Sequence, residues 1–204
     1  MFRHNFQSGL LSIFYSLGNQ PLQLWDQHAH GQGMITLDVD NDISSPILAL
    51  RSPKLSTTFI KCPAGVGVEL GIKLPIMVLN VKNIGKYFSF EVQVRDDKQV
   101  IRRFRVSTFQ TESRVQPDIC TLPLRLDEGW NQVQFDLSDF VRRTYQTCYI
   151  ETISVQIHAN CYLRRVYFAE KLYAEDQLPL EFRLYSSIKP TPPSSPSPPP
   201  PPPE

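Results

Sequence analysis

The chain has 204 residues, of which 41% are hydrophobic, and 21 basic against 20 acidic side chains give it a formal net charge of +1. A chain of this length and hydrophobic content can bury one sizeable core, so we expect one domain and no second one. The near-neutral charge argues against a protein that mainly neutralises a nucleic-acid backbone. No direct nucleic-acid partner is therefore expected.

The N-terminal segment contains an apolar run over residues 10–17, which raises the question of a signal peptide. Serines interrupt the run, no small-x-small cleavage site follows it, and no asparagine begins an Asn-x-Ser/Thr glycosylation site. No segment approaches the ~18 consecutive apolar residues of a membrane span. We therefore expect a soluble, intracellular protein without a membrane partner.

Alternating apolar and polar side chains, the two-residue period of a half-buried strand, recur along the chain. The predicted strands cover residues 22–25, 35–39, 47–50, 57–62, 71–78, 88–94, 101–106, 122–126, 131–137, 152–159, 163–168 and 181–185. Turn residues separate them, for example the pair Asp96 and Asp97. This pattern is typical of an all-β fold, and we predict an antiparallel β-sandwich or jelly roll with one or two short helices.

One short helix is predicted directly after the strand at residues 131–137. Ser138 offers a hydroxyl to the free N–H groups of a first helical turn, and Asp139 is favourable to the helix dipole there. The helix should end near Tyr145, because an extended pattern resumes shortly after it.

Cysteines and histidines offer few candidate metal ligands. The four cysteines, at positions 62, 120, 148 and 161, contain no C-x-x-C pair, and we interpret them as reduced, small core residues. His28 and His30 could face a metal together from a strand. A solvated glycine-rich loop is the favoured interpretation, and no metal or other cofactor is expected.

Three arginine clusters are the clearest charge pattern in the sequence. Arg103 and Arg105 should share the strand face opposite Phe104, and convergence of the clusters would create a basic patch for carboxylate-rich partners. The alternative is a set of ordinary solvated faces. The candidate contact residues are Arg102, Arg103, Arg105, Arg142, Arg143, Arg164 and Arg165.

The composition changes abruptly after Lys189, where ten of the 18 prolines follow within residues 190–204. Such a segment cannot form a core, so we predict a sandwich domain over residues 1–188 and a disordered proline-rich tail over residues 189–204. The tail is either a passive spacer or a ligand for SH3, WW or profilin-type domains. The candidate polyproline ligand is formed by Pro198, Pro199, Pro200, Pro201, Pro202 and Pro203.

No catalytic signature is present. The sequence lacks a G-x-S-x-G elbow, a phosphate-binding loop, a G-x-G-x-x-G motif and an H-E-x-x-H motif. Adjacent acids such as Asp127 and Glu128 point to opposite faces of a strand or lie solvated in a turn. Trp25 and Trp130 could form a sugar-binding platform only if exposed, and half-buried packing is the favoured interpretation. We expect a protein that is not an enzyme.

Five long blocks resemble one known family. They read "NFQSGLLSIFYSLGNQPLQLWD" at residues 5–26, "LGIKLP" at 70–75, "KYFSFEVQVRDDKQV" at 86–100, "DEGWNQVQFDLSDFVRRTY" at 127–145 and "YIETISVQIHANCYLRRVYF" at 149–168. Together they closely resemble the cilia- and flagella-associated protein 20 family, over nearly the whole chain up to about Tyr185.

The resemblance implies a non-catalytic β-sandwich, similar in fold to carbohydrate-binding modules, that acts as a structural protein of the axoneme. Family members sit at the inner junction of doublet microtubules, where they contact tubulin beside a parkin co-regulated partner and other microtubule inner proteins. They support the assembly and movement of cilia. The resemblance also implies association with basal bodies and centrioles and, for some members, a nuclear pool.

Two segments depart from the family. Residues 28–50 lack the basic character expected there, with Pro46 inside a predicted strand, and the proline-rich tail is additional. These differences indicate a divergent paralogue whose partner contacts are not all retained. Two alternative functions stay open, a glycan-binding sandwich and an adaptor that acts through its tail.

Overall fold

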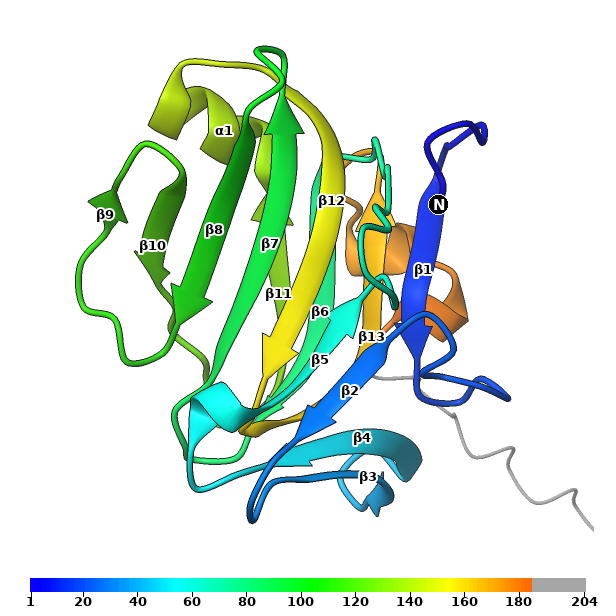
Figure 1. The fold of residues 1–204 in the computed structure, drawn as a ribbon. Coiled ribbons are helices and arrows are strands. Elements are labelled where there is room, and N and C mark those ends of the chain that lie inside the picture. The colour runs from blue at the N-terminus through cyan, green and yellow to red at the C-terminus, as the bar shows by residue number, and fades with distance from the viewer. Residues whose placement is uncertain (185–204) are drawn as a thin grey trace, which may run out of the picture.

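The computed structural model describes residues 1–184, which form two β-sheets that face each other (Figure 1). One is a six-stranded sheet in which β13 pairs with β6 on one side and with β4 and β1 on the other. Its spatial order is β11-β6-β13-β4-β3. The strands are β1 (Leu10–Tyr15), β3 (Met34–Asp40), β4 (Ser45–Arg51), β6 (Ile76–Asn83), β11 (Gly129–Asp136) and β13 (Cys161–Ala169).

The second sheet is seven-stranded, with the order β2-β5-β12-β7-β8-β10-β9. Among the described strands, only β10 runs parallel to its neighbour β8, and every other pair is antiparallel. The strands are β2 (Asp26–Ala29), β5 (Thr58–Cys62), β7 (Ser89–Asp96), β8 (Ile101–Ser107), β9 (Arg114–Val115), β10 (Ile119–Pro123) and β12 (Tyr149–His158).

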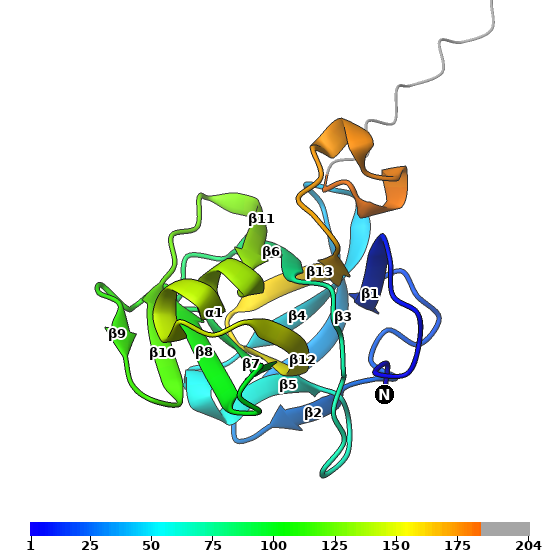
Figure 2. The same ribbon diagram turned by 90° about the horizontal axis from the view of Figure 1, so that it is seen from above.

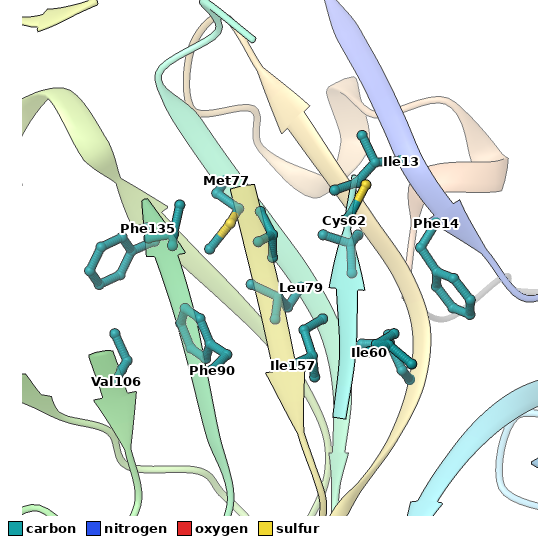
Figure 3. Close-up of a cluster of buried hydrophobic side chains, with 14 of the residues drawn as sticks. Ile13, Phe14, Ile60, Cys62, Met77, Leu79, Phe90, Val106, Phe135 and Ile157 are labelled. Atoms are coloured by element: carbon teal, nitrogen blue, oxygen red, sulfur yellow. The ribbon is translucent and has the colours of Figure 1, made fainter. Parts of the chain in front are cut away.

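The core lies between the two sheets, and Figure 3 shows part of it. Leu79 reaches it from the six-stranded sheet and Phe90 and Ile157 from the seven-stranded sheet. Fully buried Phe104 makes edge contacts with Phe135, at a ring-centroid distance of 6.1 Å. Because such rings bury a large apolar area, this cluster is a main source of stability.

The antiparallel β-sandwich predicted from the sequence is confirmed. Eight predicted strands lie where the alternation placed them, within a few residues: β3, β4, β5, β7, β8, β11, β12 and β13. Predicted strands 71–78 and 122–126 are shifted in the structure, to β6 and β10. Gly71 has a φ of +68°, and Pro75 lacks the N–H that a ladder needs, so β6 begins only at Ile76.

Two strand predictions are wrong. Residues 22–25 form turns, in which the Trp25 N–H donates to the Leu22 carbonyl at 3.0 Å, so the apparent alternation reflects successive turns that pack on the core. In the described part of predicted strand 181–185, the first two residues belong to a 3₁₀ helix, Leu180–Phe182, and the next two form bends. Two further 3₁₀ turns, Leu55–Thr57 and Glu175–Gln177, were not predicted.

Three strands escaped prediction. The serine-interrupted run at residues 10–17 contains β1, which pairs with β13. The strands β2 and β9 are short and lie at the two edges of the seven-stranded sheet. No helix among residues 1–184 is long and apolar enough to cross a membrane.

The helix α1 (Leu137–Tyr145) begins two residues earlier than an N-cap at Ser138 predicts. Asp136, not Ser138, is the N-cap, because its carboxylate accepts a hydrogen bond from the Asp139 N–H at 2.9 Å. The helix ends at Gln146, whose φ of +56° is left-handed and whose N–H bonds back to the Arg142 carbonyl.

The cysteines are all free thiols. Cys62, Cys120 and Cys161 are buried as predicted, whereas Cys148 is exposed, so the core interpretation is wrong for that residue. The proposed boundary at residue 188 and the candidate polyproline ligand lie outside the described residues.

The N-terminal residues are held to the sandwich by an ionic network. Arg3 contacts both Glu69 and Glu151, and the Arg95 guanidinium binds the same two carboxylates at 2.7 and 3.2 Å. Backbone bonds add to it, since the Phe2 N–H donates to the Leu70 carbonyl at 2.6 Å. Hydrogen bonds from Arg3 are the main reason why the pKa values of Glu69 and Glu151 lie below the ordinary 4.5.

This network predicts a pH-dependent stability. A carboxylate whose pKa is lowered by folding stabilises the protein above its unfolded pKa, and this contribution is lost as the pH falls through the folded pKa. Arg3→Gln should therefore lower the melting temperature at pH 7, and the difference from the wild type should shrink as the pH falls below 4.5. Thermal unfolding at pH 7 and pH 3.5 measures this difference, with Lys61→Gln as the single-charge control. An equal deficit at both pH values would contradict the assignment.

Candidate interaction surface on the seven-stranded sheet

The first arginine cluster divides between two sides of β8. Arg103 and Arg105 lie on the outer face of the seven-stranded sheet, and Phe104 points into the core, as predicted. Arg102 lies on the same side of the strand as Phe104, at the margin of the core. Its Cζ sits 4.4 Å from the centroid of the Tyr145 ring.

Arg102 has a structural partner. Its Nε donates to Asp96 Oδ2 at 2.9 Å, and Asp96 Oδ1 accepts the Val100 N–H at 2.8 Å in the turn between β7 and β8. Burial opposes ionisation of Asp96, but these hydrogen bonds outweigh it and hold its pKa below the ordinary value. Arg102 therefore fixes a turn.

The second cluster lies on α1 and is exposed. Arg142 and Arg143 bind Asp139 at 2.6 and 2.8 Å, and their side chains are 72% and 76% exposed. Exposed ion pairs of this kind contribute only about 0–1 kcal/mol, so the guanidinium groups can exchange this partner for another.

The third cluster is buried, contrary to the prediction of a solvated patch. Arg164 and Arg165 are 7% and 4% exposed. Seen from above, the segment after β13 lies on the side of the six-stranded sheet that faces away from the seven-stranded sheet (Figure 2). The Arg164 Nη1 donates to the Leu184 carbonyl at 2.5 Å.

Arg165 lies between two aromatic rings. Its Cζ is 3.6 Å from the centroid of the Tyr15 ring and 4.2 Å from that of Phe182. Burial lowers the pKa of Arg165 from its ordinary value. The three clusters therefore do not converge, because β13 is covered on both faces and its arginines act as internal packing groups.

The outer face of the seven-stranded sheet stays open, and no helix crosses β12, β7 or β8 in Figure 1. Strand register aligns one row of mainly polar side chains across the sheet. From the β2 edge to the β9 edge the row reads Asp26, Lys61, Gln156, Glu91, Arg105, Thr121 and Arg114. Arg114 and Thr121 were not predicted, since their place depends on the parallel pairing of β10 with β8.

Charge is unevenly distributed along this row. Arg105 binds Glu91 at 2.5 Å, whereas Lys61 and Arg114 have no ion-pair partner within residues 1–184. Arg103 precedes Arg105 by two residues on β8 and lies opposite Gln93 and Ile119. It too has no ion-pair partner within residues 1–184. Uncompensated positive charge is therefore concentrated toward β9.

Both tryptophans are packing residues, and both are buried more deeply than the half-buried packing favoured from the sequence. Trp25 is 4% exposed and donates to the Ile13 carbonyl at 2.8 Å, and Trp130 is 7% exposed and donates to Asp40 Oδ1 at 3.0 Å. Neither ring is free to stack on a ligand. The sugar-binding platform considered from the sequence is therefore not formed by these residues.

His28 differs from the loop interpretation, because it lies in β2 and its ring stacks on Phe59 at a centroid distance of 4.5 Å. His30 follows the strand and is exposed. Within residues 1–184, no three His, Cys, Asp or Glu side chains are grouped closely enough to hold a metal ion.

A large cavity lies at the end of the sandwich that holds the β6–β7 and β10–β11 connections, and none of the clustered arginines line it. It has a volume of about 980 Å³, and its lining includes Lys86, Tyr87, Arg125 and Asp127. Asp127 lies in an exposed turn, and no cysteine or histidine lines this cavity. Its mixed charges do not define one ligand class.

The buried environment of Arg165 and the exposed environment of Arg143 predict different losses of folding stability on mutation. Arg165→Glu would place an unpaired carboxylate between two aromatic rings and should destabilise the protein by about 3–5 kcal/mol. Arg143→Glu, which makes the same charge change on exposed α1, should change stability by no more than about 1 kcal/mol. Urea unfolding of both variants measures this contrast. Equal costs would contradict the burial of Arg165.

Relatives of known name match the chain over nearly its full length. It is 56% identical to "Cilia- and flagella-associated protein 20" from Chlamydomonas reinhardtii over 93% of this chain and 99% of the relative. The proteins of the same name from Caenorhabditis elegans and Paramecium tetraurelia are also 56% identical, over 93% of this chain and 93% and 98% of theirs.

Among solved structures, a family 11 carbohydrate-binding module from Clostridium thermocellum aligns with 83% of this chain and 100% of its own, at 9% identity and a TM-score of 0.44. The CFA20 domain model matches residues 1–186, which include all of the described sandwich. By this match and by its 56% identity to the named relatives, the chain belongs to the CFA20 domain family.

Proposed function

We propose that this protein is a non-catalytic, microtubule-associated structural protein of cilia and flagella. It stabilises the inner junction of axonemal doublet microtubules and supports ciliary assembly and movement. The observation that carries the proposal is the 56% identity, over 93% of the chain, to proteins named for association with cilia and flagella.

The surfaces of the molecule support this role. The sandwich presents two separate groups of cations at its surface. One is partly exposed Arg103 with exposed Arg105 on β8, and the other is the exposed pair Arg142 and Arg143 on α1. Guanidinium groups bind carboxylates in a bidentate manner, so each group suits an acidic protein surface. Two such groups on one rigid body would let it connect two neighbours.

The proposed partners are tubulin, the parkin co-regulated inner-junction protein and other microtubule inner proteins. The proposed location is the axoneme, with basal bodies, centrioles and a nuclear pool as further sites. The glycan-binding alternative gains no support, because both tryptophans are buried. The tail adaptor alternative concerns residues outside the described range.

Microtubule co-sedimentation tests the proposed contacts. The double variants Arg103→Glu/Arg105→Glu and Arg142→Glu/Arg143→Glu should be compared with Lys54→Glu/Lys73→Glu, which makes the same charge change at exposed lysines. At least one arginine variant should weaken binding about tenfold, because each reversal replaces attraction with repulsion. If all three variants sediment like the wild type, the arginine surfaces are not the microtubule contacts.

Localisation in ciliated cells tests the proposed function as a whole. A tagged full-length chain should remain on axonemes after detergent extraction, because a junction protein is bound to the microtubule wall. A chain truncated after Lys189 should behave in the same way if the sandwich carries the binding. A diffuse or purely nuclear signal from the full-length chain would contradict the proposal.

A further inference from the structure

A small cavity lies at the β9 end of the seven-stranded sheet, on its open outer face. Its volume is about 280 Å³, and we call it the arginine pocket. The residues that line it are Arg105, Gln110, Arg114, Gln116, Ile119 and Thr121. It is built by three strands, because Thr121 on β10 lies opposite Arg105 on β8 and Arg114 on β9.

The lining is rich in hydrogen-bond donors and contains no acid. Arg114 has no side-chain hydrogen bond or ion pair within the described part of the chain, and its fork of five donors is unused there. The Thr121 hydroxyl oxygen is shielded from solvent and also lacks a partner among residues 1–184. A buried polar group without a partner is costly, so a ligand that pairs with it would be favoured.

These groups match an oxyanion, and the local charge selects its class. Glu91 binds Arg105 at 2.5 Å and offsets about one of the two positive charges of the pocket. One uncompensated charge suits a carboxylate, which carries one negative charge, better than a phosphate group, which carries about two at neutral pH. The planar fork of Arg114 can also bind a carboxylate through two parallel hydrogen bonds.

The surroundings indicate that the carboxylate belongs to an extended peptide. Arg103 precedes Arg105 by two residues on the same face of β8, so the two lie about 6.4–6.8 Å apart along the strand. Alternate side chains of an extended peptide have the same spacing. A segment lying along β8 could therefore present one acidic side chain to the pocket and another to Arg103.

We propose that the arginine pocket binds a side-chain carboxylate of an extended acidic peptide segment of a partner protein, with Arg103 holding a second carboxylate of that segment. Arg114 and Arg105 are the charged ligands, and the Thr121 hydroxyl donates a further hydrogen bond. The inference rests on the proposed function in one respect, because it names the chemistry by which the outer face of the seven-stranded sheet would recognise an acidic partner.

Fluorescence anisotropy with fluorescein-labelled hexaglutamate tests the proposal on the full-length protein. Arg114→Gln should weaken binding at least about fivefold, because it removes one bidentate charge-assisted contact. Thr121→Val should weaken it at least about threefold, because it removes one hydrogen bond to the ionised carboxylate. Lys73→Gln, which removes one exposed positive charge outside the pocket and outside both arginine groups, is the control and should change the affinity less than twofold. Thermal unfolding confirms that each variant is folded.

Three results would overturn the proposal. One is the absence of saturable hexaglutamate binding, and another is an equal loss of affinity for Arg114→Gln and Lys73→Gln, which would mean diffuse charge attraction. The third is stronger binding of a phosphoserine hexapeptide or of inorganic phosphate than of hexaglutamate. The assay contains no microtubules, so hexaglutamate binding by a protein that fails to co-sediment would reject the proposed function and leave this inference standing.

Discussion

The arrangement of this molecule depends on β13, a strand that is paired along both edges and buried on both faces. β6 occupies one edge, and β4 and β1 divide the other between them. Eight of its nine residues are buried. A strand in this position needs a cover on each face, and the seven-stranded sheet provides one while residues 170–184 provide the other (Figure 2). The two outer faces of the sandwich therefore cannot be equivalent.

This asymmetry decides which charges can meet a partner. Arg164 and Arg165 lie under the C-terminal cover, where a carbonyl and two aromatic rings replace the solvent that a guanidinium otherwise needs. On the other side of the sandwich no segment within residues 1–184 forms a comparable cover, and Arg103 and Arg105 stay in contact with solvent. Arginines from equally arginine-rich stretches of sequence are therefore buried packing groups on one sheet and solvent-accessible groups on the other.

The alternation of side chains was sufficient to predict most of the strands that carry the core, because burial of one face imposes a period of two along strands such as β7 and β12. It could not predict what depends on contacts between distant segments. The cover over Arg165 forms from 3₁₀ turns that carry no periodic signal, so a strand was predicted there instead. The arginine pocket requires β10 to pair parallel with β8, and nothing in the local sequence around Arg114 or Thr121 indicates that pairing.

The net charge of +1 does not show how charge is distributed over the molecule, because acidic and basic side chains are nearly equal in number but unevenly placed. Around the N-terminal arm, Arg3 and Arg95 are matched by Glu69 and Glu151. Such internally balanced groups hold segments together and contribute little to the field outside the molecule. On the outer face of the seven-stranded sheet, two of the three unmatched cations, Arg103 and Arg114, lie toward β9, and the third is Lys61. An acidic partner that approaches this face is therefore attracted more strongly to that end. Because that end is open to solvent, salt screens its charges strongly. Raising the ionic strength must therefore weaken association through this face more than it lowers the stability of the fold.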